Sequence, residues 1–257
     1  MNRLNNLFLT KNKKVLSVYF SAGHPNLKDT ATIICSLAKA GADIVEIGMP
    51  FSDPVADGPV IQQSSLRALK NGMSVKVLFE QLEDIRQQTQ IPIVLMGYLN
   101  PVLQYGIDKF CERCKHVGVD GLILPDLPPE IFNQQYRTTF DKYNLCNILL
   151  VPPQTSSERI LQLDKWSSGF LYIVAASSTT GAKQSFQPYQ VEYFKRLENL
   201  KLSNPKLIGF GISSRESFDD ACNYANGAII GSAFVKALEA NGEITNIVEN
   251  FIREIKG

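Results

Sequence analysis

ADIVEIG, residues 42–48, is the stretch that decides the fold class, because similar stretches recur along the chain. Asp43 stands near its start, and the apolar run that follows is interrupted by one charge, Glu46, close to its end. Such runs, with little polar alternation, are typical of strands in a parallel sheet that is covered on its faces by helices. Seven more runs have this character: VLSVYF (15–20), IPIVLM (91–96), DGLILP (120–125), NILLVP (147–152), FLYIVA (170–175), KLIGFG (206–211) and GAIIGS (227–232).

Longer segments with apolar residues at helical spacing lie between these runs. Eight strands alternating with helices predict either a closed (β/α)₈ TIM barrel or a doubly wound open sheet. The count of eight favours the barrel, and the first strand is not followed by the GxGxxG of a dinucleotide-binding fold. The helices are expected at 27–40, 74–88, 107–117, 129–142, 156–165, 188–199, 214–223 and 243–255, with Asp29, Ser74, Ser156 and Ser213 near their starts.

Length and charge restrict the class of protein further. The 257 residues suit one barrel, and no linker-like run divides them, so residues 1–257 are expected to form a single domain. The chain has 26 Lys and Arg against 25 Asp and Glu, so its net charge of +1 gives no general attraction to nucleic acid or to an anionic membrane. No stretch is long and apolar enough for a membrane span.

Five cysteines and the amino-terminal sequence indicate the compartment. An odd number of cysteines in a domain of this size argues against a disulfide framework. The start MNRLNNLFLTKNKK has no secretory h-region. We therefore expect a reducing compartment, either the cytoplasm or a plastid stroma. Cys111 and Cys114 form a CxxC inside a helical stretch with no second pair, so no metal site is expected there.

Two carboxylates mark the loop after the second strand. Strand side chains alternate in direction, so Ile44 and Glu46 share the face toward the barrel interior, and Val45 and Ile47 share the other. A buried carboxylate near the barrel mouth needs either a basic partner or a function. The other seven strands offer no inward Lys or Arg, so catalysis is the favoured interpretation. Asp57, in ADGP, would complete a pair suited to moving protons, although turn formation alone could also explain an Asp there.

Small residues mark the ends of the last two strands. Gly211 follows the seventh strand in GFGIS, and Gly231 and Ser232 end the eighth just before AFVKAL. Glycine lets a ligand approach backbone N–H groups closely, and a helix N-terminus attracts anions. Turn glycines are the alternative, but two such sites at neighbouring strand ends favour a phosphate site.

The string EIGMPFSDPVADGPVIQ, residues 46–62, closely resembles the signature of tryptophan synthase α subunits. That resemblance implies cleavage of indole-3-glycerol phosphate into indole and glyceraldehyde 3-phosphate. It also implies that Glu46 is the acid/base at indole C3 and that Asp57 binds the indole N–H. Asp53 and Pro54 match positions where the β subunit docks.

The resemblance extends over nearly the whole chain. Gly211, Gly231 and Ser232 match phosphate-binding positions, and LNNLFL (4–9) matches a short extra helix that closes the bottom of the barrel. In the loop AASSTTGAKQSF (175–186), Thr180 matches a lid threonine and Gly181 a phosphate-loop glycine. Ser178, Thr179 and His24 depart from the residues that many members carry. His24 is assigned no catalytic role.

An apolar pocket for indole is expected at the strand ends. Tyr98 and Tyr172 match family pocket positions, and Tyr19 and Phe210 are further candidates. Met96 and Ile123 are candidates that core packing explains equally well.

The family implies an α₂β₂ complex in which a β subunit carries pyridoxal phosphate and receives indole, with no cofactor in this chain. Two alternatives stay open. One is another phosphate-binding barrel enzyme, such as an isomerase or indole-glycerol-phosphate synthase, although a synthase would place a lysine at a strand end. The other is a non-catalytic activator of the β subunit.

Overall fold

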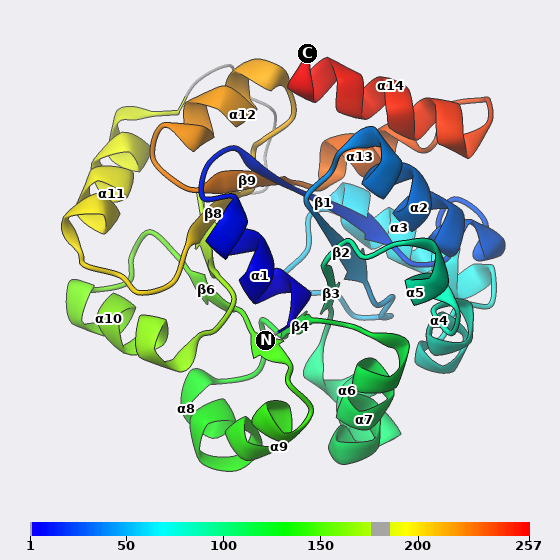
Figure 1. The fold of residues 1–257 in the computed structure, drawn as a ribbon, viewed down its shortest axis with the longest axis horizontal. Helices are drawn as coiled ribbons and strands as arrows, with labels where there is room; N and C mark the ends of the chain where they lie inside the picture. Colours follow the sequence, from blue (N-terminus) through cyan, green and yellow to red (C-terminus); the bar gives the residue numbers. More distant parts are fainter. Residues whose placement is uncertain (1, 176–185) are drawn as a thin grey trace.

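Parallel apolar strands form the centre of the molecule, and helices form a ring around them (Figure 1). The structure is a computed structural model and describes residues 2–175 and 186–257. Within these ranges the strands are β1 (Val15–Ser21), β2 (Ile44–Gly48), β3 (Ile93–Met96), β4 (Gly121–Ile123), β5 (Cys146–Asn147), β6 (Leu149–Val151), β7 (Leu171–Val174), β8 (Lys206–Gly209) and β9 (Gly227–Ile230).

The sheet closes on itself as a barrel. The strand order is β5-β4-β3-β2-β1-β9-β8-β7-β6, and each neighbouring pair is parallel. Only Ile148 separates β5 from β6, and its N–H donates to the Leu122 carbonyl at 3.0 Å. Residues 146–151 therefore act as one slightly interrupted strand that joins both ends of the sheet. The predicted eight-stranded TIM barrel is confirmed, with the expected strand 147–152 split in two.

The helices of the described residues cover the outside of the barrel. They are α1 (Arg3–Thr10), α2 (Thr30–Ala40), α3 (Pro59–Lys70), α4 (Val75–Gln81), α5 (Ile85–Gln88), α6 (Leu99–Tyr105), α7 (Ile107–Val117), α8 (Pro129–Ile131), α9 (Arg137–Lys142), α10 (Ser157–Trp166), α11 (Pro188–Asn199), α12 (Arg215–Cys222), α13 (Ser232–Ala237) and α14 (Ile244–Lys256), with a 3₁₀ turn η1 (Leu27–Asp29) and a π segment η2 (Phe132–Tyr136). None of these helices is long and apolar enough to cross a membrane.

Local sequence explains where most helices begin. Ser74 and Ser156 accept from the N–H groups of Val77 and Arg159, as N-cap serines do, so both caps are confirmed. At α12 the cap is Ser214 rather than the expected Ser213. The expected helix 74–88 breaks into α4 and α5, and the expected helix 129–142 contains the π segment η2. Helices α3 and α6 lie in segments for which no helix was predicted.

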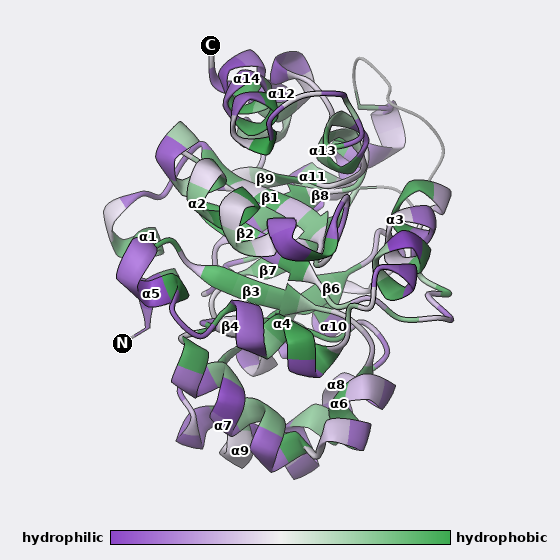
Figure 2. Ribbon diagram, turned by 90° about the vertical axis from the view of Figure 1, so that its right-hand side faces the viewer, coloured by the Kyte–Doolittle hydropathy of each residue, from purple (hydrophilic) through white to green (hydrophobic). Residues whose placement is uncertain are grey.

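Two apolar cores lie on opposite faces of the strands. Val45 and Ile47 of β2 face outward and pack with the helices, whereas Ile44 faces inward and packs with Val94 and Ile229. The alternation predicted for β2 is therefore confirmed. Figure 2 shows the strands as the most hydrophobic part of the chain and the outer helices as mixed, which is the pattern expected of amphipathic helices on a buried sheet.

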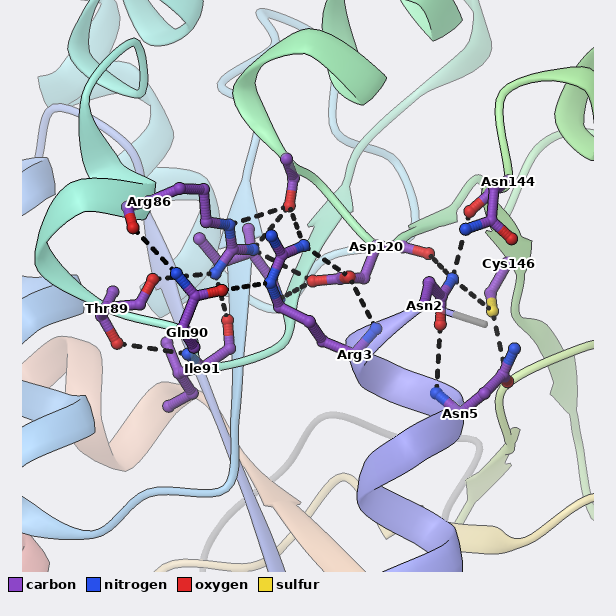
Figure 3. Close-up of polar contacts among 12 residues, drawn as sticks. Asn2, Arg3, Asn5, Arg86, Thr89, Gln90, Ile91, Asp120, Asn144 and Cys146 are labelled. Atoms are coloured by element: carbon purple, nitrogen blue, oxygen red, sulfur yellow. Dashed lines mark hydrogen bonds and ion pairs between the residues drawn. The ribbon is translucent and has the colours of Figure 1, made fainter.

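The short helix α1 closes the amino-terminal end of the barrel, as expected (Figures 1 and 2). Leu4 is fully buried in the inner core, and the ring centroids of Phe8 and Phe170 are 6.2 Å apart. Side chains that lie beneath the strands hold this helix in place (Figure 3). Asp120, buried just before β4, forms ion pairs with Arg3 at 3.2 Å and with Arg86 at 3.0 Å. The strands' carboxyl ends are thus left as the open end of the barrel.

Candidate active site

Glu46 is a fully buried carboxyl near the carboxyl end of β2. The hydroxyl of Ser17, on the neighbouring strand β1, donates to Glu46 Oε1 at 2.7 Å. Oε2 is also buried and has no hydrogen-bond partner in residues 2–175 and 186–257. Within the same ranges no Lys or Arg forms an ion pair with Glu46. A structural salt bridge therefore does not explain this carboxyl there.

Burial raises the pKa of Glu46 from 4.5 to about 7, and the hydrogen bond from Ser17 opposes this rise. The carboxyl is consequently divided almost equally between its acid and its ionised form near neutral pH. A group with this property can donate a proton and take one back with little energetic penalty, which is the requirement for an acid/base catalyst.

Asp57 is the second carboxyl and lies in the loop between β2 and α3. Tyr98, just before α6, donates its hydroxyl to Asp57 Oδ2 at 3.2 Å and accepts from the Ala56 N–H at 2.9 Å. Burial raises the pKa of Asp57 from 3.8 to about 6, and the Tyr98 hydrogen bond opposes this rise. Asp57 therefore ionises at lower pH than Glu46.

The two carboxyls face a common space. Burial raises the pKa of Tyr19, and the negative charges of Asp57 and Glu46 raise it further. The pKa of Tyr172 on β7 is raised by burial first and then by the same two carboxyls. Tyr19 on β1 and Tyr172 on β7 therefore both lie close enough to the two carboxyls to be affected by their charge.

An aromatic pocket adjoins Asp57. The rings of Phe51 and Tyr98 lie 5.3 Å apart at 31°. The predicted pocket residues Tyr19 and Tyr98 are both present, and so is Met96. Among the described residues the lining is Tyr19, Met49, Phe51, Pro54, Asp57, Ser65, Met96, Gly97, Tyr98 and Pro125, so the predicted Tyr172 and Phe210 lie outside it.

Two strand glycines make room for the side chains of Tyr19 and Tyr172. A Cβ at Gly48 would lie 2.1 Å from the Tyr19 hydroxyl, and one at Gly209 would lie 2.3 Å from the Tyr172 hydroxyl. The glycines at these strand ends thus allow each tyrosine to approach the backbone of the neighbouring strand closely. Ile123 lies deeper, in the inner core.

The carboxyl ends of β8 and β9 present glycine backbone to the barrel mouth. Phe210 and Gly211 follow β8 with positive φ angles of 67° and 86°, and Phe210 packs edge-on to Tyr172 with ring centroids 6.0 Å apart. Among the described residues, no atom would lie within 4 Å of a Cβ at Gly211. Gly231 is the N-cap of α13, and a Cβ there would lie 3.6 Å from the Tyr19 ring. Open backbone therefore borders the aromatic pocket.

The two residues expected to contact the β subunit differ in their exposure to solvent. Asp53 is exposed, whereas Pro54 is buried and forms part of the pocket wall. Val55, next to it, is 87% exposed. The expected lid residue Thr180, together with Gly181, Ser178 and Thr179, lies outside the described residues.

Other residues weighed in the sequence lie away from the two carboxyls. His24 is fully buried and both ring nitrogens lack a partner in the described residues. Cys111 and Cys114 are both fully buried on α7, and burial raises the pKa of Cys111 to about 12. In the described part of the chain, no group of three or more His, Cys, Asp or Glu could hold a metal ion.

Sequence reasoning overlooked Ser17, the residue in direct contact with Glu46. Its signal was available: it is the one polar residue within VLSVYF, and alternation places it on the same face as Tyr19. Phe51 and Met49 were overlooked as pocket residues because they follow the strand, in a loop whose path the sequence does not predict.

A closed parallel α/β barrel whose mouth carries two carboxyls of raised pKa beside an aromatic pocket defines a TIM-barrel enzyme of acid–base chemistry. The family model described as tryptophan synthase alpha chain matches residues 6–256. The tryptophan synthase alpha chain of Flavobacterium psychrophilum is 53% identical over 255 residues, which cover 99% of this chain and 100% of the relative. This chain belongs to the tryptophan synthase alpha chain family.

Further relatives and solved structures agree over the full length. The alpha chain of Flavobacterium johnsoniae is 51% identical over 256 residues, covering 100% of both chains. The crystal structure of tryptophan synthase subunit alpha from Legionella pneumophila superposes with a TM-score of 0.89 at 33% identity, covering 99% of this chain and 97% of that one. Tryptophan synthase from M. tuberculosis, in an aminoacrylate-bound form, gives 0.86 at 30% identity, covering 99% and 98%.

Proposed function

We propose that this chain is the lyase subunit that cleaves indole-3-glycerol phosphate into indole and glyceraldehyde 3-phosphate by a retro-aldol reaction. The observation that carries the proposal is the buried Glu46 carboxyl, with one oxygen held by Ser17 and the other unpartnered in the described residues, in a member of this family. The residue roles below follow from the resemblance and from this geometry together.

Glu46 performs both proton transfers. In its acid form it protonates indole C3, which leaves the ring as an iminium ion and Glu46 as a carboxylate. The carboxylate then takes the proton of the C3′ hydroxyl while the C3–C3′ bond breaks and its electron pair restores the aromatic indole. The aldehyde of glyceraldehyde 3-phosphate forms, and Glu46 is again an acid, so the cycle balances. This scheme requires no metal or electron-sink cofactor.

Asp57 stabilises the positive charge that develops on the indole ring. Its carboxylate accepts the indole N–H, and this interaction strengthens as the nitrogen becomes positive. Tyr98 keeps Asp57 in place and favours the ionised form. The flat indole ring would lie between the pocket residues Tyr19 and Tyr98 on one side and Tyr172 and Phe210, from β7 and the end of β8, on the other.

The late strand ends bind the phosphate. Gly211 and Gly231 expose backbone there, and no side chain of the described residues caps the start of α13 at Ser232, so its N–H groups are available to an anion. We assign Gly181 to the same phosphate site and Thr180 to the lid from the family resemblance alone.

The partner is a tryptophan synthase β subunit, which carries pyridoxal phosphate and receives the indole in an α₂β₂ complex. The exposed Asp53 and Val55, beside Pro54, form the docking segment. We place the complex in the cytoplasm and expect residues 1–257 to unfold as one domain, in a single transition.

The decisive experiment is an assay of the purified chain with indole-3-glycerol phosphate, with and without a β subunit. Indole should form in both mixtures, and Glu46→Gln should lose cleavage while it still stimulates the β reaction. Stimulation of the β subunit without any cleavage by the unmodified chain would instead identify a non-catalytic activator. Absence of both would point to another phosphate-binding barrel enzyme.

A further inference from the structure

Ser17 is placed to control the orientation of the Glu46 carboxyl. It lies on the inner face of β1, is fully buried, and its hydroxyl donates to Glu46 Oε1 at 2.7 Å. The residues paired with Ser17 on either side are Ile44 of β2 and Ile229 of β9, both aliphatic and both in the inner core. Glu46 is therefore the only hydrogen-bond partner that the described residues give this hydroxyl.

The contact makes the two oxygens of Glu46 inequivalent. Oε1 is engaged by Ser17, and Oε2 is buried without a partner in the described residues. With Oε1 accepting from Ser17, the acid form carries its proton on Oε2. Glu46 pairs across the sheet with Tyr19 on one side and Val94 on the other, and neither is recorded as a hydrogen-bond donor to it. Ser17 thus fixes which oxygen is free for chemistry.

We propose that Ser17 is a positioning residue for Glu46, whose hydroxyl holds one carboxyl oxygen so that the other carries protons to and from the substrate. This inference rests on the acid/base role proposed for Glu46. It extends that role, because it assigns the two oxygens different tasks and names the residue that separates them.

A second consequence concerns ionisation. A hydroxyl that donates to a carboxylate stabilises the ionised form, so Ser17 keeps the pKa of Glu46 lower than burial alone would. The titratable groups that face Glu46 in the described residues are Tyr19 on β1, Asp57 after β2 and Tyr172 on β7. Burial raises the pKa of both tyrosines, so they stay neutral between pH 5 and 9, and Asp57 is the one neighbour that titrates in that range.

The test combines a spectroscopic titration with kinetics. The carboxyl carbon of Glu46 is followed by NMR against pH in protein labelled with ¹³C at glutamate side-chain carboxyls, and its signal is assigned by its loss in Glu46→Gln. In Ser17→Ala the midpoint should rise by about one pH unit from its value of about 7, since a hydrogen bond to a charged group is lost. Turnover measured at pH 6 should fall about tenfold, through misorientation of the carboxyl, with KM unchanged.

Ser17→Thr keeps the hydroxyl and should restore both the midpoint and turnover. Ser17→Cys, which is closer in size and a weaker donor, should give intermediate values and serves if the added methyl of threonine prevents folding. The matched control is Ser21→Ala. Ser21 is a buried serine on the same face of β1, and its hydroxyl contacts the hydroxyls of Ser64 at 2.7 Å and Tyr19 at 3.5 Å rather than Glu46. In Ser21→Ala the titration midpoint of Glu46 should equal that of the unmodified chain.

An unchanged Glu46 midpoint in Ser17→Ala, or a lowered melting temperature with unchanged midpoint and turnover, would overturn the proposal and leave Ser17 a packing residue. A restored midpoint without restored turnover in Ser17→Thr would also contradict it. If the unmodified chain makes no indole, the proposed function fails, but the NMR midpoints of Ser17→Ala and Ser21→Ala still decide whether Ser17 controls Glu46.

Discussion

Replacing Glu46 by glutamine is expected to make the folded chain more stable at pH 8 while it removes nearly all cleavage. The reason is that Glu46 is fully buried, which opposes its ionisation. Glutamine has the same shape, can still accept from Ser17 and never ionises. The substitution therefore removes an unfavourable buried charge together with the proton that the reaction needs.

The magnitude follows from the displaced pKa of Glu46. One pH unit of displacement corresponds to about 1.4 kcal/mol, so a rise from 4.5 to about 7 corresponds to about 3 kcal/mol. Between these two values the folded chain holds a proton that the unfolded chain releases, so folding stability falls as pH rises and the loss is complete above about pH 7. Glu46→Gln escapes this loss, so its advantage should grow from near zero at pH 4 to about 3 kcal/mol at pH 8.

The assay is urea unfolding followed by circular dichroism at pH 5, 6.5 and 8. Glu112→Gln, the same change at an exposed residue of α7, is the control and should alter the free energy of unfolding by less than about 0.5 kcal/mol at every pH. A stability difference between Glu46→Gln and the unmodified chain that stays constant from pH 5 to 8 would refute the reasoning. Cleavage should fall by at least about 10²-fold in the same variant.

Four further results are expected from the structure. The pH profile of kcat/KM should rise through the pKa of Asp57, about 6, and fall through that of Glu46, about 7, because the reaction needs the first ionised and the second protonated. Tyr98→Phe should move only the acidic limb of that profile, upward by about one pH unit, and an unmoved limb would mean that its hydroxyl does not stabilise the carboxylate. Gly48→Ala should raise KM, measured by steady-state kinetics, because the new methyl would lie 2.1 Å from a tyrosine hydroxyl on β1; an unchanged KM would contradict this. Asp120→Ala should lower the free energy of urea unfolding by roughly 3–5 kcal/mol, since two arginines lose a buried partner, and a loss below about 1 kcal/mol would contradict that assignment.

The barrel could be predicted from the sequence because each strand is a short apolar run whose faces are fixed by alternation. That rule predicts Ile44 and Glu46 on the inner face and Val45 on the outer face, and the two apolar cores contain Ile44 and Val45 accordingly. It could not predict the break at Ile148, because a single residue between two strands does not alter the sequence pattern of 146–151.

Two helical features were harder to predict for identifiable reasons. The π segment Phe132–Tyr136 adds one residue to a turn, which blurs the helical period only locally. The helix α3 begins at Pro59, directly after a turn-rich segment, and half of its residues in PVIQQSSLRALK are polar. Proline at the first helical position was the available signal for that start.

The active site likewise has features that the sequence predicts and features that it does not. The inward position of Glu46 could be predicted from β2 alone, but its partner Ser17 is 29 residues away and its choice of oxygen depends on side-chain direction. The hydrogen bond between Tyr98 and Asp57 likewise joins residues 41 apart, from two different strand–loop units. Sequence alternation predicts which face a residue occupies, and only the closed sheet determines which residues meet there.

The contributions of early and late strands to the barrel mouth suggest how this framework could be altered. Glu46, Asp57 and Tyr98 come from the first hundred residues, whereas Gly211, Gly231 and Ser232 come from the last fifty. The residues assigned to bond cleavage and the residues assigned to binding the anionic end of the substrate therefore lie on separate segments of the chain. Exchanging the segments after β8 and β9 for those of other barrels would be a route to new substrates that leaves the proton-transfer residues untouched.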